Sequence, residues 1–226
     1  SEKVCNSSGL CLTSRVLAGM NHCLSIMHPR KLSAISMSIA TPTAYNSLSC
    51  PTTYDAAINA AVSNGVPVVI ASGNAGNKTG IASPACSPNA TSVGMTYDAN
   101  VGAGAWVAPA SCIDNPTFAD KVVCASNSGA NLDLMAPGAR IISTTSSIGT
   151  ACGAGNGQMT YSCSGTSMAA PHVAGAVVLM KQRYPQLSGS YPAAFKIETL
   201  LKSSGIFVTD LGNNLTFPRL SLQRLI

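Results

Sequence analysis

Ser167 lies between a turn of small residues and a long apolar segment. Gly165 and Thr166 precede it, and residues 176–180 (AVVLM) are all apolar up to Lys181. A helix that begins here would direct unpaired backbone N–H groups and partial positive charge toward Ser167, where they would stabilise developing negative charge. Gly165 would permit the tight turn that exposes the hydroxyl. Ser167 is therefore a candidate nucleophile, and the alternative from the residues alone is a serine N-cap on a buried helix.

A longer motif around Ser167 favours the nucleophile. Residues 165–175 (GTSMAAPHVAG) match without a gap the nucleophile motif of the subtilisin-like serine peptidases. Further segments resemble the same family in order and spacing: residues 35–40 (ISMSIA), 69–76 (VIASGNAG), 126–129 (SNSG) and 132–138 (LDLMAPG). The resemblance covers nearly the whole chain. It implies a secreted serine endopeptidase that acts on polypeptides through an acyl-enzyme at Ser167.

The resemblance also implies roles for residues that follow two of the expected strands. Asn74 would donate its side-chain amide to the tetrahedral oxyanion, together with the backbone N–H of Ser167. Spacing alone would indicate only a turn residue before Gly76, since asparagine favours turns. Small side chains on two segments would form an open pocket for a bulky apolar residue before the scissile bond. These residues are Ser38, Ile39 and Ala40 on one side, and Ala71, Ser72 and Gly73 on the other.

The acid and base of a catalytic triad are missing from the expected positions. The family carries them in Asp-(Ser/Thr)-Gly and His-Gly-Thr turns upstream of the matched segments, and neither tripeptide occurs here. His172 corresponds to a core residue turned away from the serine, and His22 and His28 fall where the family has no catalytic group. A serine without a base is a weak nucleophile. We therefore expect the carboxyl-terminal portion of a subtilase, with Asp and His supplied by an upstream segment or a separate chain.

A non-catalytic function is the alternative, namely a subtilase-like protein used for extracellular assembly or binding in which Ser167 is idle. An open sheet without its amino-terminal strands would expose backbone and apolar surface, which favours association. Other hydrolase classes fit poorly. GTSMA is not the G-x-S-x-G elbow, residues 73–79 lack the glycine that precedes lysine in a phosphate loop, and no H-E-x-x-H zinc motif occurs.

The composition is typical of a densely packed secreted protein, with 46% apolar and only 9% charged residues. The 13 basic and 8 acidic residues are scattered, so no nucleic-acid-binding surface is indicated. No apolar run reaches the roughly 18 residues that span a bilayer. Calcium commonly stabilises the family, yet the acidic residues show no clustered ligand spacing, and we expect no cofactor.

The nine cysteines, without a C-x-x-C motif, indicate disulfides formed in an oxidising compartment. Cys23 would remain as a buried free thiol, with an intermolecular bridge as the alternative. The plausible local pairs are Cys5–Cys11, Cys50–Cys86, Cys112–Cys124 and Cys152–Cys163, although other connectivities stay open. Possible glycan acceptors are Asn6, Asn77, Asn89 and Asn214.

Alternation of helical and apolar extended segments predicts an α/β fold with a parallel sheet, formed by residues 1–226 as one domain. The resemblance implies a three-layer subtilisin-like fold that lacks its amino-terminal strands. Chemistry would then lie at the carboxyl ends of the strands, where residues 72–74 follow a buried strand. The expected helices cover residues 14–27, 52–64 and 194–202 besides the one after Ser167. The expected strands cover residues 32–39, 66–71, 91–97, 121–125 and 140–144, with an irregular insertion at 98–120 and a glycine-rich loop at 149–157.

Overall fold

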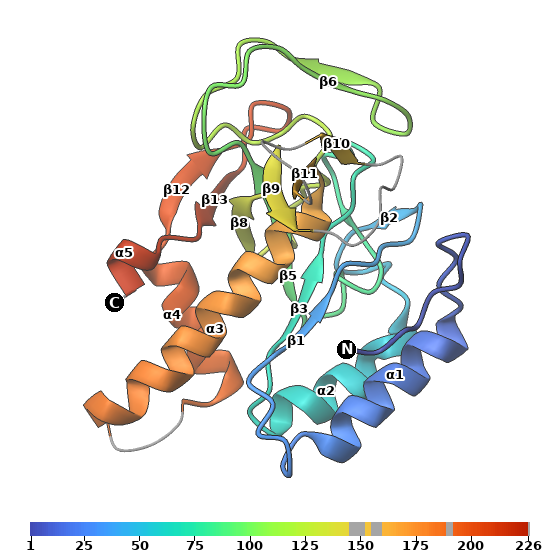
Figure 1. The fold of residues 1–226 in the computed structure, drawn as a ribbon, viewed down its shortest axis with the longest axis vertical. Coiled ribbons are helices and arrows are strands. Elements are labelled where there is room, and N and C mark those ends of the chain that lie inside the picture. Colours follow the sequence, from blue (N-terminus) through green and yellow to red (C-terminus); the bar gives the residue numbers. More distant parts are fainter. Residues whose placement is uncertain (145–151, 155–159, 189–191, 226) are drawn as a thin grey trace.

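The structure, a computed structural model, describes the backbone of residues 1–144, 152–154, 160–188 and 192–225, and the side chains of these except 152–154 and 186–188. A six-stranded sheet forms its centre, in the order β1-β3-β5-β8-β13-β12 (Figure 1). All neighbouring strands are parallel except β12 and β13. The strands are β1 (Ile35–Met37), β3 (Val68–Ala71), β5 (Thr91–Thr96), β8 (Leu134–Pro137), β12 (Ile206–Thr209) and β13 (Thr216–Arg219).

Helices cover both faces of this sheet. β3 shows why, because its side chains alternate between two apolar clusters. Val68 and Ile70 pack with α1 (Thr13–Ile26) and α2 (Asp55–Ser63), whereas Val69 and Ala71 pack with α3 (Thr166–Ser188) and α4 (Ala194–Ser203). A short 3₁₀ turn, η1 (Thr52–Tyr54), precedes α2, and α5 (Leu222–Leu225) follows β13. The expected three-layer α/β architecture is confirmed.

Three smaller sheets lie beside the central one. β9 (Ile141–Thr144), β10 (Cys152–Ala154) and β11 (Thr160–Cys163) pair antiparallel and lead directly into α3. β2 (Ala44–Tyr45) pairs with β4 (Ile81–Ala82), and β6 (Gly104–Trp106) pairs with β7 (Cys112–Asp114). The expected glycine-rich loop lies outside the described residues apart from β10.

Two sequence-based expectations for the strands were wrong, and three strands of the central sheet, β8, β12 and β13, were not predicted. Residues 121–125 are not a strand, because only Val122 makes an isolated bridge to the end of β5. The insertion at 98–120 is not wholly irregular, since it contains the β6–β7 hairpin. The sequence also failed to predict β8, which lies within the sheet. β8 has only four residues, three of them fully buried, so it shows no alternation.

The helix after Ser167 is only partly buried, contrary to expectation. Val178 and Leu179 are 47% and 41% exposed, and His172 is exposed rather than in the core. These three exposed residues show that α3 presents one uncovered face to solvent.

No helix in the described part of the chain is sufficiently long and apolar to cross a membrane.

Three of the expected disulfides are confirmed: Cys5–Cys11, Cys50–Cys86 and Cys112–Cys124. Cys163 is also disulfide-bonded and faces Cys152 in the β10–β11 register, but the side chain of Cys152 lies outside the described residues. Cys23 is free and half-buried. The glycan acceptors remain predictions; Asn6, Asn89 and Asn214 are exposed and Asn77 is half-buried.

A buried polar cluster joins the β6–β7 hairpin to β5. The Tyr97 hydroxyl donates to Asp114 Oδ2 at 3.1 Å and accepts from Trp106 Nε1 at 3.0 Å. Lys121 Nζ lies 3.2 Å from Asp114 Oδ1, and the Cys124 N–H donates to Oδ2 at 2.9 Å. The single tryptophan thus holds the insertion against the core.

Because Tyr97 belongs to this cluster, we expect the free energy of unfolding to fall at alkaline pH. Burial raises the pKa of Tyr97 from 10.0 to about 12, so the folded protein keeps a proton that the unfolded chain releases. The free energy of unfolding should consequently fall as pH rises from about 10 to about 12. Tyr97→Phe should remove that part of the fall, measured by denaturant unfolding across this pH range. An unchanged slope in the variant would show that Tyr97 does not retain its proton.

Candidate active site

Ser167 occupies the first turn of α3 and is half-buried. The turn before it is fixed by the backbone, because the Gly165 N–H donates to the Gly138 carbonyl at 2.8 Å and the Met168 N–H donates to the Gly165 carbonyl at 2.9 Å. The Ser167 N–H is among the first amides of the helix, which lack partners within it. The predicted arrangement of a hydroxyl at a helix N-terminus is present.

Asn74, 93 residues earlier in the sequence, lies beside the same turn. Its Oδ1 accepts from the Thr166 backbone N–H and from the Thr166 hydroxyl, both at 2.9 Å. Because a backbone N–H can only donate, the accepting atom must be the amide oxygen, and the Nδ2 group is left to face elsewhere. A Cβ built on Gly165 would lie 3.3 Å from Nδ2, so this nitrogen lies over the backbone just before Ser167.

Asn127 organises the loop that carries Asn74, a role that the sequence analysis missed. It is fully buried, and its Oδ1 accepts from the backbone N–H groups of Ala75 and Asn77, each at 3.0 Å. Its Nδ2 donates to the Ser72 carbonyl at 3.1 Å, and its own N–H donates to the Gly73 carbonyl at 2.9 Å. One side chain therefore satisfies three backbone groups of a single loop.

The two segments expected to line a substrate pocket differ in exposure. Ser38 and Ala40 are exposed and Ile39 is half-buried. The Ser38 hydroxyl donates to the Ser167 carbonyl at 2.8 Å, so this segment does reach the nucleophile turn. On the other side Ala71, Ser72 and Gly73 are buried. The Ser72 hydroxyl donates to the Asn127 carbonyl at 2.9 Å, so it holds the loop together.

No described histidine or carboxylate hydrogen-bonds Ser167. The hydroxyl makes only a long contact, 3.5 Å, with the Ser38 carbonyl oxygen. His172 Nδ1 lies 2.8 Å from the Met168 carbonyl of its own helix, and His22 lies 3.6 Å from Glu2 beside α1. His28 lines a cavity described below, at the opposite end of α3. Among the described residues, no hydrogen bond therefore joins any of the three histidines to Ser167, and His172 and His22 have other partners.

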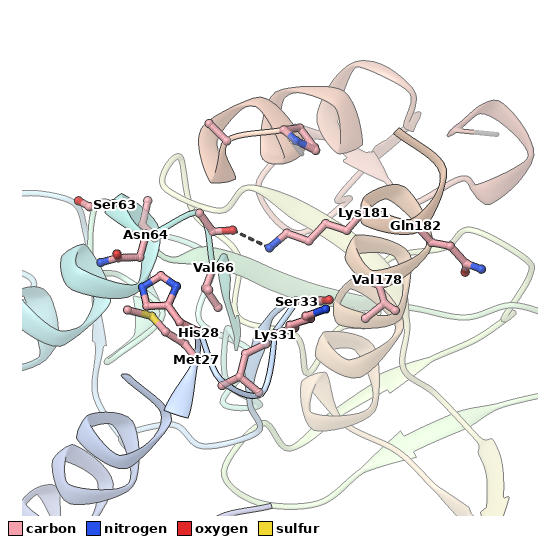
Figure 2. A pocket seen from close by; sticks show the side chains of 15 residues that line it. Met27, His28, Lys31, Ser33, Ser63, Asn64, Val66, Val178, Lys181 and Gln182 are labelled. Carbon is pink, nitrogen blue, oxygen red and sulfur yellow. Dashed lines mark hydrogen bonds between the residues drawn. The ribbon is translucent and has the colours of Figure 1, made fainter. Parts of the chain in front are cut away.

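A cavity of about 890 Å³ lies away from Ser167, where the α1–β1 and α2–β3 connections meet the C-terminal half of α3 (Figure 2). Lys181 extends across it and donates to the Gly65 carbonyl at 2.6 Å, and burial lowers the pKa of this lysine. Its lining includes Val178, eleven residues after Ser167, which is about 16 Å along the helix. This cavity is therefore separate from the candidate active site.

A second cavity, of about 470 Å³, is lined by β1, by α1 and by the N-terminal residues Ser1, Glu2 and Val4. It is lined by Ser38 and Ile39 but not by residues 71–73, so it does not join the two expected pocket walls. Among the described residues, no three His, Cys, Asp or Glu side chains are grouped to hold a metal ion. The expectation of no cofactor stays a prediction.

Gly73 provides a test of the loop geometry. Its φ is +102°, and a Cβ there would overlap Asn127 Nδ2. Gly65 also has a positive φ, +75°, but a Cβ there would meet nothing within 4 Å. Gly65→Ala should cost about 1 to 2 kcal/mol of stability from backbone strain alone. Gly73→Ala should cost at least about 3 kcal/mol, because Asn127 must also give up hydrogen bonds. Thermal unfolding of both variants measures the difference, and equal losses would contradict the role given to Asn127.

A mostly parallel sheet, with a serine at a helix N-terminus beside an asparagine from the end of another strand, is the arrangement that the resemblance to the subtilisin-like serine peptidases implies. Residues 3–217 match the Subtilase family, and the chain belongs to this family. It is 37% identical over 156 residues to an extracellular protease of Xanthomonas campestris pv. campestris, covering 69% of this chain and 22% of that protein.

Two further comparisons agree. The chain is 33% identical over 189 residues to subtilisin DY of Bacillus licheniformis, covering 83% of this chain and 55% of that protein. Its fold resembles that of the prenylagaramide maturation protease PagA with a TM-score of 0.69 at 21% identity, covering 98% of this chain and 69% of that one. The chain thus spans about a fifth of the length of the Xanthomonas protease and just over half of the length of subtilisin DY.

Proposed function

We propose that this chain is the nucleophile-bearing part of a secreted serine endopeptidase, which cleaves peptide bonds through an acyl-enzyme at Ser167. The observation that carries the proposal is the convergence of Ser167 and Asn74. Thr166 links them, since it donates twice to Asn74 Oδ1 and its hydroxyl accepts from the Gly73 N–H at 3.1 Å. Secretion is supported by the disulfides and by the similarity to the extracellular protease of Xanthomonas.

The geometry supports a defined sequence of steps. Ser167 Oγ attacks the peptide carbonyl carbon while a base accepts its proton. The carbonyl oxygen becomes an oxyanion, for which Asn74 Nδ2 and the Ser167 N–H are the available donors. Collapse of this intermediate expels the amine, which takes up the proton, and water then hydrolyses the ester by the same steps. Ser38 and Ile39 would hold the substrate residue that precedes the scissile bond.

The base and its aspartate would come from a segment outside these 226 residues. Two uncovered surfaces support this part of the proposal. β1 is an edge strand, and its free side is adjacent to the Ser38 segment that contacts Ser167 (Figure 1). The face of α3 that bears His172, Gly175 and Leu179 is exposed. A segment packed along both could bring an imidazole to about 3 Å from Ser167 Oγ.

The alternative is a non-catalytic protein that uses these surfaces for assembly. It is favoured by one observation, the lack of any described group that could take the proton from Ser167. A native mass spectrum of the protein from its source, followed by a denaturing and reducing one, separates the two. An accompanying polypeptide, or a longer form of this chain, that carries Asp-(Ser/Thr)-Gly and His-Gly-Thr turns would support the peptidase. Protein made only of copies of these 226 residues would refute it.

A further inference from the structure

Lys78 and Asp210 form an ion pair behind the loop that carries Asn74. Lys78 Nζ lies 2.9 Å from Asp210 Oδ2, and the two side chains are only 19% and 4% exposed. They are 132 residues apart in the sequence. The same nitrogen donates to the Ser126 carbonyl at 3.0 Å. Breaking a pair this buried leaves an uncompensated charge, so its geometry is strongly favoured over the separated state.

The Asp210 carboxylate also binds two other groups. Oδ2 accepts from the Ser128 hydroxyl at 2.6 Å, and Oδ1 accepts from the Gly212 N–H at 2.8 Å. Asp210 begins the turn between β12 and β13. It therefore connects this C-terminal hairpin to residues 126–128, the segment that also supplies Asn127.

The hairpin turn packs over Lys78 as well. Asn213 Nδ2 donates to the Lys78 carbonyl at 2.9 Å and to the Ser128 hydroxyl at 3.1 Å. A Cβ on Gly212 would lie 2.8 Å from Lys78 Cε, so the turn fits closely against the lysine side chain. The backbone after Asn74 is thus held by Asn127 on one side and by the hairpin on the other.

We propose that Lys78 and Asp210 are positioning residues, which fix the loop after β3 so that Asn74 Nδ2 faces the oxyanion. The proposal rests on the proposed function, in which Asn74 is an oxyanion donor. Neither side chain contacts Ser167 or the first turn of α3 among the described residues, so any effect on hydrolysis must pass through the loop. Loss of the pair should lower kcat with little change in KM, because oxyanion stabilisation acts in the transition state.

The test is a double-mutant cycle in the complete protein. Asp210→Asn should lower kcat about tenfold, and should lower it no further when Asn74 is already alanine. Asp120→Asn is the matched control. It breaks another ion pair of the same hairpin, Arg219 Nη2 to Asp120 Oδ2 at 2.7 Å, which does not touch the Asn74 loop. This control should leave kcat unchanged. Equal losses of kcat from Asp210→Asn in both backgrounds would overturn the positioning role.

A second measurement does not depend on activity. Amide hydrogen exchange of residues 74–80 should rise in Asp210→Asn and stay unchanged in Asp120→Asn, because only the first variant releases the loop. Unchanged exchange in Asp210→Asn would contradict the proposal. If the protein hydrolyses no peptide at all, the proposed function fails, while the exchange result still decides whether the pair holds the loop.

Discussion

Replacing Ser167 with alanine should lower peptide hydrolysis by the complete protein by a factor on the order of 10⁶. This factor is the effect of the corresponding change in subtilisin itself. The reason is that the acyl-enzyme cannot form without the hydroxyl, whereas the oxyanion donors remain. The measurement is kcat on a chromogenic peptide with a bulky apolar residue before the scissile bond.

Ser203→Ala is the control for this variant. Ser203 is an exposed serine at the end of α4, and its hydroxyl donates only to the Leu200 carbonyl at 3.2 Å. It should leave kcat unchanged. Residual hydrolysis by Ser167→Ala within tenfold of the parent would show that another group is the nucleophile.

Asn74→Ala should lower kcat by about 10²- to 10³-fold and leave KM nearly unchanged. The range is that found for one oxyanion-hole donor in subtilisin. The physical reason is that Asn74 Nδ2 is turned from Thr166 toward the backbone beside Ser167, where negative charge would develop. Steady-state kinetics on the same peptide separate kcat from KM.

Asn74→Asp is the companion variant. An aspartate keeps the oxygen that accepts from the Thr166 N–H and hydroxyl, but it has no N–H to offer to the oxyanion. It should therefore preserve the helix turn and still lose at least as much kcat as Asn74→Ala. If Asn74→Asp were as active as the parent, the Thr166 contacts rather than oxyanion binding would explain the importance of Asn74.

The residues that sequence reasoning identified are those in continuous motifs. GTSMAAPHVAG located Ser167 and the start of α3, and the buried run before Ser72 located β3 together with Asn74. Such motifs work because one turn and one strand end determine the local geometry. The α1 and α4 helices were likewise predicted to within two residues, since their apolar faces repeat at the helical period.

Longer-range features were not predictable in this way. The loop groups that the Asn127 side chain binds, and the Lys78 and Ser128 partners of Asp210, lie at least 50 positions away in the sequence. Nothing near Asn127 or Asp210 in the sequence reveals these partners. β8 was missed because burial on both faces removes the alternation that identifies a strand. The exposure of Val178 and Leu179 on α3 was missed because both side chains are apolar. Exposure depends on what packs against a helix, which composition does not determine.

Covalent labelling tests most directly whether Ser167 is an activated nucleophile. The protein, purified from its source with any accompanying segments, would be treated with an organophosphonate probe, digested and mapped by mass spectrometry. Our account predicts a stoichiometric adduct on Ser167, which Ser167→Ala abolishes and which denaturation before treatment prevents. An assembly that contains the missing aspartate and histidine turns, but leaves Ser167 unlabelled, would contradict the account.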